Sequence, residues 1–160
     1  MKKKTVWIAL AVCLAAVAGM VVSIALTGGE AEQPEFVPPA FEASAMAGAP
    51  DVTDKSYTQI YKAGMGFSAH VCGKVAVDGQ TANVFFTNDS GNTVWLRLRI
   101  LDEQDNLLAE TGILRPNEYV QAVTFTRLPG KGAKIKLKIM AYEPDTYYSA
   151  GAVTLYTTAE

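Results

Sequence analysis

The sequence predicts an all-β fold, a single sandwich of about seven strands, for the part of the chain that begins near Phe67. Three observations predict it. After Phe67 the chain consists of short runs rich in apolar and β-branched residues. Several of these runs alternate apolar with polar side chains, and clusters of Gly, Pro, Asn and Asp separate them at regular intervals. This spacing is typical of two packed antiparallel sheets.

Each predicted strand except the last is followed by a turn signal. The strands span residues 67–77, 81–87, 93–101, 107–111, 118–127, 134–142 and 147–157. The turn signals are Asp78-Gly79, the clusters at 88–92 and 102–106, the crossing between Gly112 and Pro116, and the clusters at 129–132 and 143–146. Seven strands in about 90 residues is the count of an immunoglobulin-like or fibronectin-like sandwich. Residues 55–62, before the first strand, fit either a short helix or an extra strand.

Strict alternation assigns the two faces of the third and sixth strands. The expected core residues are Val94, Leu96, Leu98 and Ile100 in the third strand, and Ile135, Leu137, Ile139 and Ala141 in the sixth. Successive side chains of a strand point to opposite faces, so the cations between these residues should face solvent. A register slip of one residue would bury the cations, and we therefore expect the register to be strongly specified.

The N-terminus predicts a membrane anchor. Lys2, Lys3 and Lys4 precede an uncharged apolar run of 21 residues, from Val6 to Leu26. As a helix this run would be about 31 Å long, enough to cross the hydrocarbon core of a bilayer. The lysines should remain cytoplasmic and the rest of the chain should be extracytoplasmic. Two alternatives are signal-peptide cleavage near Ala31, which would release the domain, and lipidation at Cys13, which the bulky Val12 before it disfavours.

Residues 28–54 are rich in Gly, Ala, Pro and Glu and predict a low-complexity, flexible linker. The predicted organisation is thus an anchor over 1–27, a linker over 28–54 and an extracytoplasmic domain over 55–160. Phe36, Val37 and Phe41 are unusual in a spacer. A second interpretation is that a short segment around them docks on the domain or on a partner.

Composition limits the possible functions. The net charge is −2 at pH 7, so no overall basic field favours a nucleic-acid partner. The two cysteines are predicted on different sides of the bilayer boundary, Cys13 within it and Cys72 outside. We therefore expect no internal disulfide and stabilisation by core packing alone. Cys72 is expected to be a buried strand residue, with an intermolecular disulfide as the alternative.

Three stretches carry a family resemblance: LLAETGILRPNEYV at 107–120, LPGKG at 128–132 and AYEPDT at 141–146. With the N-terminus, they resemble small exported proteins of Firmicutes that have a lysine-led membrane segment, a tether and one immunoglobulin-like domain, some of them encoded within mobile or conjugative elements. The resemblance implies fold and location and brings no catalytic residues. Asn117 stands where glycine would be expected after the proline, and Asn also tolerates turn geometry.

The sequence contains few residues that could form a catalytic or metal-binding site. His70 and Cys72 share one face of the first strand, but no third group is evident that would orient a nucleophile pair, and they are too few for a zinc site. The acidic turn of Asp102, Glu103, Asp105 and Asn106 would attract Ca²⁺ only if Asp89, Asn92 or Asp145 came close. Turn formation explains these residues equally well. We therefore expect no catalytic, cofactor or metal site.

The one surface feature that suggests binding is cationic. Its members lie on the outward faces of the third and sixth strands, which are commonly neighbours in an immunoglobulin-like sheet: Arg97, Arg99, Lys134, Lys136 and Lys138. Such a row would suit an anionic partner, and its alternative role is that of an ordinary solvated sheet face. Tyr142, Tyr147, Tyr148 and Tyr156 lie near the last strand and fit either a binding surface or ordinary strand positions.

These observations favour a non-enzymatic, membrane-tethered extracytoplasmic protein, with a structural or protein-binding role in the bacterial envelope or in a surface or transfer assembly. The alternative is a secreted domain that binds a polyanion, such as teichoic acid or an acidic protein, through the five cations. The expected partners are the membrane and an envelope or surface protein.

Overall fold

The computed structural model of the protein describes residues 36–53, 56–60 and 66–160. The predicted membrane segment, residues 6–26, lies outside these ranges. Within them, we find no helix whose length and apolar character would let it span a bilayer. Every regular element of the described residues is a β-strand.

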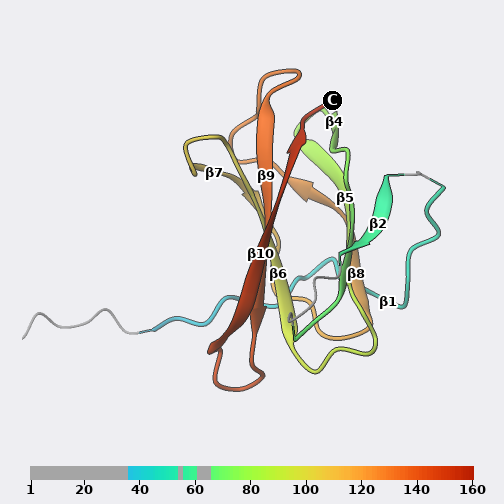
Figure 1. The fold of residues 1–160 in the computed structure, drawn as a ribbon, viewed down its shortest axis with the longest axis vertical. Coiled ribbons are helices and arrows are strands. Elements are labelled where there is room, and N and C mark those ends of the chain that lie inside the picture. The colour runs from blue at the N-terminus through green and yellow to red at the C-terminus, as the bar shows by residue number, and fades with distance from the viewer. Residues whose placement is uncertain (1–35, 54–55, 61–65) are drawn as a thin grey trace, which may run out of the picture. The chain divides into compact units, whose positions relative to one another are not determined.

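The described residues from Pro38 onward form two sheets that face each other (Figure 1). The first has the order β1-β8-β5-β3-β2, with β4 also paired to β5. Its strands are β1 (Met46–Ala47), β2 (Tyr57–Ile60), β3 (Ala69–Cys72), β4 (Ala76–Asp78), β5 (Thr81–Asn88) and β8 (Glu118–Thr124). The second has the order β10-β9-β6-β7. Its strands are β6 (Trp95–Leu101), β7 (Leu107–Glu110), β9 (Lys134–Tyr142) and β10 (Ser149–Thr158). The predicted all-β sandwich is confirmed.

The described residues contain ten strands rather than seven. The predicted strand 67–77 is divided into β3 and β4. The pairing of β3 with β2 ends at Cys72, and Val75 then forms a parallel bridge with Ala159. The stretch 55–62, for which the sequence fits either a helix or a strand, contains β2, which pairs antiparallel with β3. The remaining addition is β1, which pairs with β8 inside the predicted linker.

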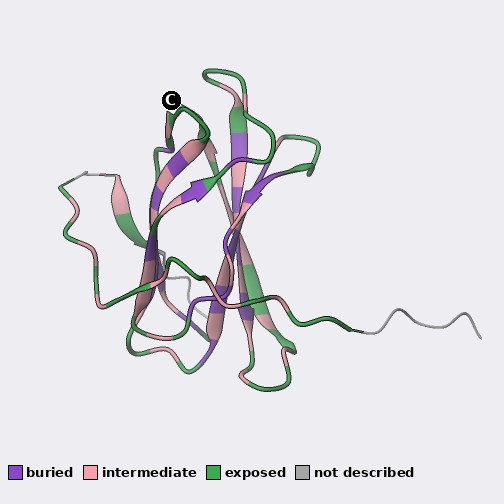
Figure 2. Ribbon diagram, turned by 180° about the vertical axis from the view of Figure 1, so that it is seen from behind, coloured by how far each residue is buried: buried purple, intermediate pink, exposed green. Residues whose placement is uncertain are grey.

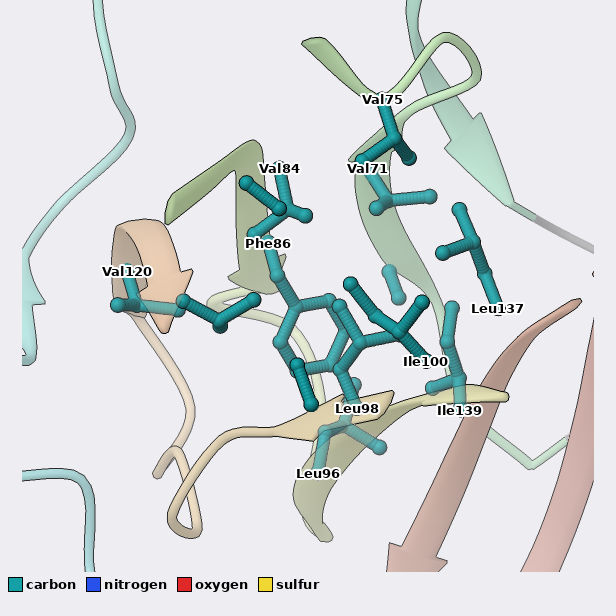
Figure 3. Packing of buried hydrophobic residues seen from close by; sticks show 14 of the residues in the cluster. Val71, Val75, Val84, Phe86, Leu96, Leu98, Ile100, Val120, Leu137 and Ile139 are labelled. Carbon is teal, nitrogen blue, oxygen red and sulfur yellow. The ribbon is translucent and has the colours of Figure 1, made fainter. Parts of the chain in front are cut away.

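The core lies where the alternation placed it (Figure 2). The expected inward residues of β6 and β9 are buried, and Leu96, Leu98 and Ile100 show no exposed surface. Phe86, from β5, belongs to the same core cluster as these three side chains, and Figure 3 shows the four residues among the packed side chains of this cluster. Burying each such side chain contributes roughly 1.5–3 kcal/mol, so this interface is the main source of stability. Cys72 is buried as expected, with 2% of its surface exposed.

Asn88, at the end of β5, is a polar residue with no exposed surface. Its Nδ2 donates to the carbonyl oxygens of Val94 (3.0 Å) and Leu114 (2.9 Å), and its Oδ1 accepts from Asn92 Nδ2 (2.6 Å). Its own carbonyl accepts the Asn117 N–H at 3.0 Å. Because each lost partner would leave a buried polar group unsatisfied, at a cost of about 1–3 kcal/mol, this side chain fixes the loops at one end of both sheets.

Asn117 adopts the left-handed conformation, with φ of 66°. The expectation that Asn replaces glycine there for turn geometry is confirmed. The residue also anchors the start of the domain, because the Gly48 N–H donates to its carbonyl at 2.8 Å.

Part of the predicted linker belongs to the sandwich. The chain from Pro38 to Gly48 runs beside the crossing that follows β7, where Ile113 N–H donates to the Ala40 carbonyl and its own carbonyl accepts the Glu42 N–H, each at 2.9 Å. Phe41 packs edge-on against Trp95 with 4.9 Å between ring centroids, and Arg115 Cζ lies 3.6 Å from the Phe41 centroid. The docking interpretation therefore holds for Phe41. We call residues 38–48 the docked segment; it begins well before the predicted domain boundary at residue 55.

Gly112 allows the docked segment to approach. A Cβ at Gly112 would lie 2.5 Å from the Glu42 nitrogen and 2.6 Å from Glu42 Cα, both of them backbone atoms that cannot rotate away. The glycine N–H also donates to Glu42 Oε2 at 2.7 Å. Burial would raise the pKa of Glu42, but hydrogen bonds from the Ser44 hydroxyl, the Gly112 N–H and the Ser44 N–H together hold it below its ordinary value of 4.5.

We expect Gly112→Ala to displace the docked segment and to lower the free energy of unfolding by about 1–3 kcal/mol, because the new methyl group and the backbone of Glu42 cannot occupy the same space. Chemical denaturation followed by circular dichroism measures the loss, and limited proteolysis between Pro38 and Gly48 measures the displacement. Gly130→Ala is the matched control, since its Cβ would meet no atom within 4 Å. Equal stability of the two variants would contradict this account.

The docked segment should also loosen in acid. A carboxyl group whose pKa is lowered by folding stabilises the folded state fully above its unfolded pKa, here near 4.5, and this contribution disappears as the pH falls through the lowered folded value. We expect the Gly112 and Ile113 amides to exchange faster below about pH 4.5, after correction for intrinsic rates. The Phe125 amide, which donates to Gln80, is the internal reference. Glu42→Gln should remove this pH dependence; an unchanged acid response would exclude Glu42 as its source.

Candidate functional site

The five predicted cations occupy one outer face of the second sheet, which we call the basic face: Arg97, Arg99, Lys134, Lys136 and Lys138. The expected pairing of their two strands is confirmed, because β6 and β9 form an antiparallel ladder in which Arg99 is opposite Lys138 and Leu101 opposite Lys136. Residues directly opposite each other share a face of the sheet. The sequence therefore located this cluster correctly; whether it binds a partner stays a prediction.

The two arginines are already paired. Glu110, on the neighbouring strand β7, lies 2.7 Å from Arg97 Nη2 through its Oε1 and 2.9 Å from Arg99 Nε through its Oε2. Arg97 Nε also donates to the Thr111 carbonyl at 2.9 Å, and only 13% of the Arg97 side chain is exposed. These contacts assign the arginines to holding β6 and β7 together, and they reduce the positive charge that the basic face presents.

The three lysines differ from one another. Lys136 is largely buried by its neighbours, and its Nζ lies 2.8 Å from Asp105 Oδ1 and 2.9 Å from the Glu103 carbonyl oxygen. The hydrogen bond to Asp105 raises the pKa of Lys136. Lys134 is exposed, with a long contact of 3.9 Å to Glu103. Lys138 forms no ion pair within 4.0 Å among the described residues, so it is the cation of the face with its charge left uncompensated.

The acidic turn after β6 organises itself around Asp102. Its Oδ1 accepts the Gln104 and Asn106 N–H groups at 2.9 and 2.8 Å, and its Oδ2 accepts from Asn106 Nδ2 and from Arg127 Nη2. The hydrogen bond from the Asn106 side chain, together with the other donors, lowers the pKa of Asp102. The carboxylate is thus committed to the turn and to Arg127.

The fold does not supply further oxygen ligands to this turn. Asp89 and Asn92 precede β6 and Asp145 follows β9, so all three lie at the opposite end of the β6–β9 ladder from Asp102. In the part of the chain that the structure describes, no three His, Cys, Asp or Glu side chains are grouped so as to hold a metal ion.

A hollow of about 360 Å³ lies at one end of the basic face. Lys134 and Lys136 line it with Tyr156, and Glu103 closes one side. Tyr156, which lies opposite Lys136 on β10, is 79% exposed. The lining of the hollow therefore combines an aromatic residue, two lysines and one glutamate.

The predicted tyrosines do not form one cluster. Tyr147 packs edge-on against Trp95 at 5.3 Å, at the end of the domain where Phe41 docks. Tyr142 is opposite Trp95 in the β6–β9 ladder, and Tyr148 is 71% exposed in the turn before β10. Tyr156 lies near the other end of β10.

Sequence reasoning missed a second polar group, around Asp89. Its Oδ2 accepts from the Ser68 hydroxyl (2.6 Å) and Gln59 Nε2 (3.2 Å), and lies 3.9 Å from His70 Nδ1. His70 stacks on Tyr57 with 5.5 Å between ring centroids. No local motif could have revealed this group, because Tyr57 and Gln59 belong to the strand that the sequence left ambiguous. The Ser68 hydroxyl donates to Asp89 itself. Because Gln59 lies in β2, Ser68 just before β3 and Asp89 in the β5–β6 loop, these contacts tie the three segments together.

Comparisons with known proteins do not identify a family for this chain. No family model matches the chain, and no curated protein matches it. Among solved structures it is distantly similar to part of a Ruminococcus gnavus beta-glucuronidase, whose crystal structure was determined in complex with uronic isofagomine. The match has 20% sequence identity and a TM-score of 0.36, and covers 56% of this chain and 15% of that chain.

We expect Glu110→Gln to lower the free energy of unfolding by about 1–2 kcal/mol, because it leaves Arg97 and Arg99 side by side without their shared counter-ion. Urea denaturation measures the change, which should shrink as NaCl screens the repulsion. Glu160→Gln is the matched control: its pair with Lys74 is largely exposed and should contribute less than about 0.5 kcal/mol. A loss no larger than that of the control would contradict a structural role for Glu110.

Proposed function

We propose that this protein is a membrane-tethered, extracytoplasmic, immunoglobulin-like binding module of the bacterial envelope, without enzymatic activity of its own. The observation that carries the proposal is the lysine-led apolar run, residues 6–26, followed in the same chain by a compact sandwich that begins at Pro38. A single helix of that length would hold the domain at the membrane surface.

The strand order supports the immunoglobulin-like part of the proposal. In such domains the third, sixth and seventh main strands are neighbours in one sheet, and the first, second and fifth are neighbours in the other. Here β6, β9 and β10 are neighbours, as are β3, β5 and β8, while β7 lies beside β6. This arrangement also supports the resemblance to exported, anchored proteins of Firmicutes, whose members include proteins of mobile or conjugative elements.

The alternative function, polyanion binding by a released domain, has weaker support from the geometry. Glu110 pairs with both arginines, and Asp105 pairs with Lys136. The charge available to an anionic polymer is then mainly that of Lys134 and Lys138. Two such charges suit a local contact with one acidic group better than an extended polymer.

Cysteine labelling tests the location. Because Cys72 is buried, we expect the folded wild-type domain to react little with a membrane-impermeant maleimide, whereas Lys131→Cys, in an exposed turn, should react in intact Gram-positive cells. Lys3→Cys is the matched control on the predicted cytoplasmic side, and should react only after permeabilisation.

The intact mass in the membrane fraction decides between anchor and secretion. A labelled Lys131→Cys protein that retains its N-terminus supports the anchor. A product beginning near Glu30 or Glu32 in the medium would support the secreted alternative, and no labelling of Lys131→Cys in intact cells would contradict both.

A further inference from the structure

The edge of the second sheet at β10 has an unusual composition. β10 is the last strand of its sheet and runs for ten residues, Ser149–Thr158, without a charged residue or a proline. Edge strands expose a row of unpaired N–H and C=O groups, and proteins commonly protect them with lysine, proline, bulges or short length. The other sheet edges are shorter: β1 has two residues, and β2 and β7 have four each.

Among the described residues, the contacts that protect β10 are confined to its two ends. A bulge between Ser149 and Gly151 distorts its start. Beyond its end, Ala159 N–H donates to the Ala133 carbonyl and Glu160 N–H donates to the Val75 carbonyl, each at 2.9 Å. Between them, the backbone of residues 152–156 has, among the described residues, no hydrogen bond outside its ladder with β9. This stretch of five residues is long enough to pair with one short strand.

The two sheets differ in extent at this edge. Both ends of β3 lie near β10: a Cβ at Gly151 would be 3.8 Å from the Phe67 ring just before β3, and Thr157 Oγ1 donates to the Gly73 carbonyl just after it. β2 continues the first sheet beyond β3. Thr58 pairs with the inward-facing Val71 and therefore points toward the second layer, yet it is exposed. Among the described residues, the second layer thus has no strand opposite β2.

The charge of Lys138 indicates which side chain an added strand should have on its outer face. On the outer face, Thr154 is opposite Lys138, the cation without an ion pair, and Ala152 is opposite Met140. A strand added beside β10 would place one side chain opposite Thr154, and a glutamate there can reach over the small threonine to Lys138. Its neighbours on either side would face inward, beside Val153 and Leu155, which pack against the core. An apolar residue suits both positions.

We propose that β10 receives an extended peptide segment of a partner protein, added antiparallel to residues 152–156, with an acidic residue facing Lys138 flanked by apolar residues. A second copy of this chain fits less well. Antiparallel pairing of two β10 strands would place both first sheets on the same side, where β2 and β3 of the two copies would collide. The inference deepens the proposed binding function and does not depend on how the protein is attached to the membrane.

The test uses the full-length protein in detergent micelles and a fluorescein-labelled synthetic decapeptide of alternating valine and threonine with one central outward glutamate. We expect saturable binding by fluorescence anisotropy, and slowed hydrogen exchange confined to β10. A peptide with lysine in place of glutamate should bind roughly two- to fivefold more weakly, and Lys138→Gln should abolish that preference. A peptide with a central proline should not bind.

Substitutions in β10 distinguish binding by strand addition from other ways of binding the peptide. Thr154→Lys should abolish binding, whereas the matched control Thr93→Lys, in an exposed loop, should bind like wild type. Ala152→Lys provides a second edge variant if Thr154→Lys unfolds by circular dichroism. Failure of all peptides to bind, or unchanged binding to both edge variants, would overturn the proposal. So would a dimer in sedimentation that Thr154→Lys dissociates. Failure of the maleimide test alone would overturn the location and leave this inference standing.

Discussion

The pairing register between β6 and β9 is the constraint on which the rest of the domain depends. It places Leu96, Leu98 and Ile100 of β6 beside the apolar face of β9, inside the sandwich. The same register places Arg99 opposite Lys138 on the outside. Shifting it by one residue would bury guanidinium and ammonium groups, whose desolvation would cost far more than the apolar contacts contribute. Core and basic face are therefore two consequences of one alternation.

That register also brings like charges together on the outer face, and β7 and the turn before it supply carboxylates that pair with them. Like charges directly opposite each other in a sheet are destabilising. Glu110 supplies a carboxylate to both arginines, and Asp105 supplies one to Lys136. The turn that carries Asp105 is itself held by Asp102. The face that looked like a binding stripe in the sequence is thus largely an internally compensated ion network, with Lys138 as its uncompensated member.

Local patterns were sufficient for the strands from β5 to β10 and for the faces of β6 and β9, because period-two alternation and turn residues are local signals. They failed where partners are distant in sequence. Residues 38–48 have a linker composition, yet their backbone pairs with Ile113, and only the absent side chain of Gly112 makes that approach possible. The five cations were located correctly from alternation. Their counter-ions were not, because Glu110 and Asp105 approach only through a hairpin whose register no single strand reveals.

The docked segment and Asn88 form a connected set of hydrogen bonds at the end of the domain at which the chain enters. Gly48 donates to Asn117, and Asn117 donates to the buried Asn88, so the entering chain is joined to the core through two consecutive hydrogen bonds. β10 has no such connection along residues 152–156 of its outer edge within the described chain. Among the described residues, backbone hydrogen bonds are thus concentrated where the chain enters the domain, whereas residues 152–156 have none on their outer edge. For the tethered binding module that we propose, this division would be useful, because the hydrogen bonds at the entering chain leave the outer edge of β10 available to a partner.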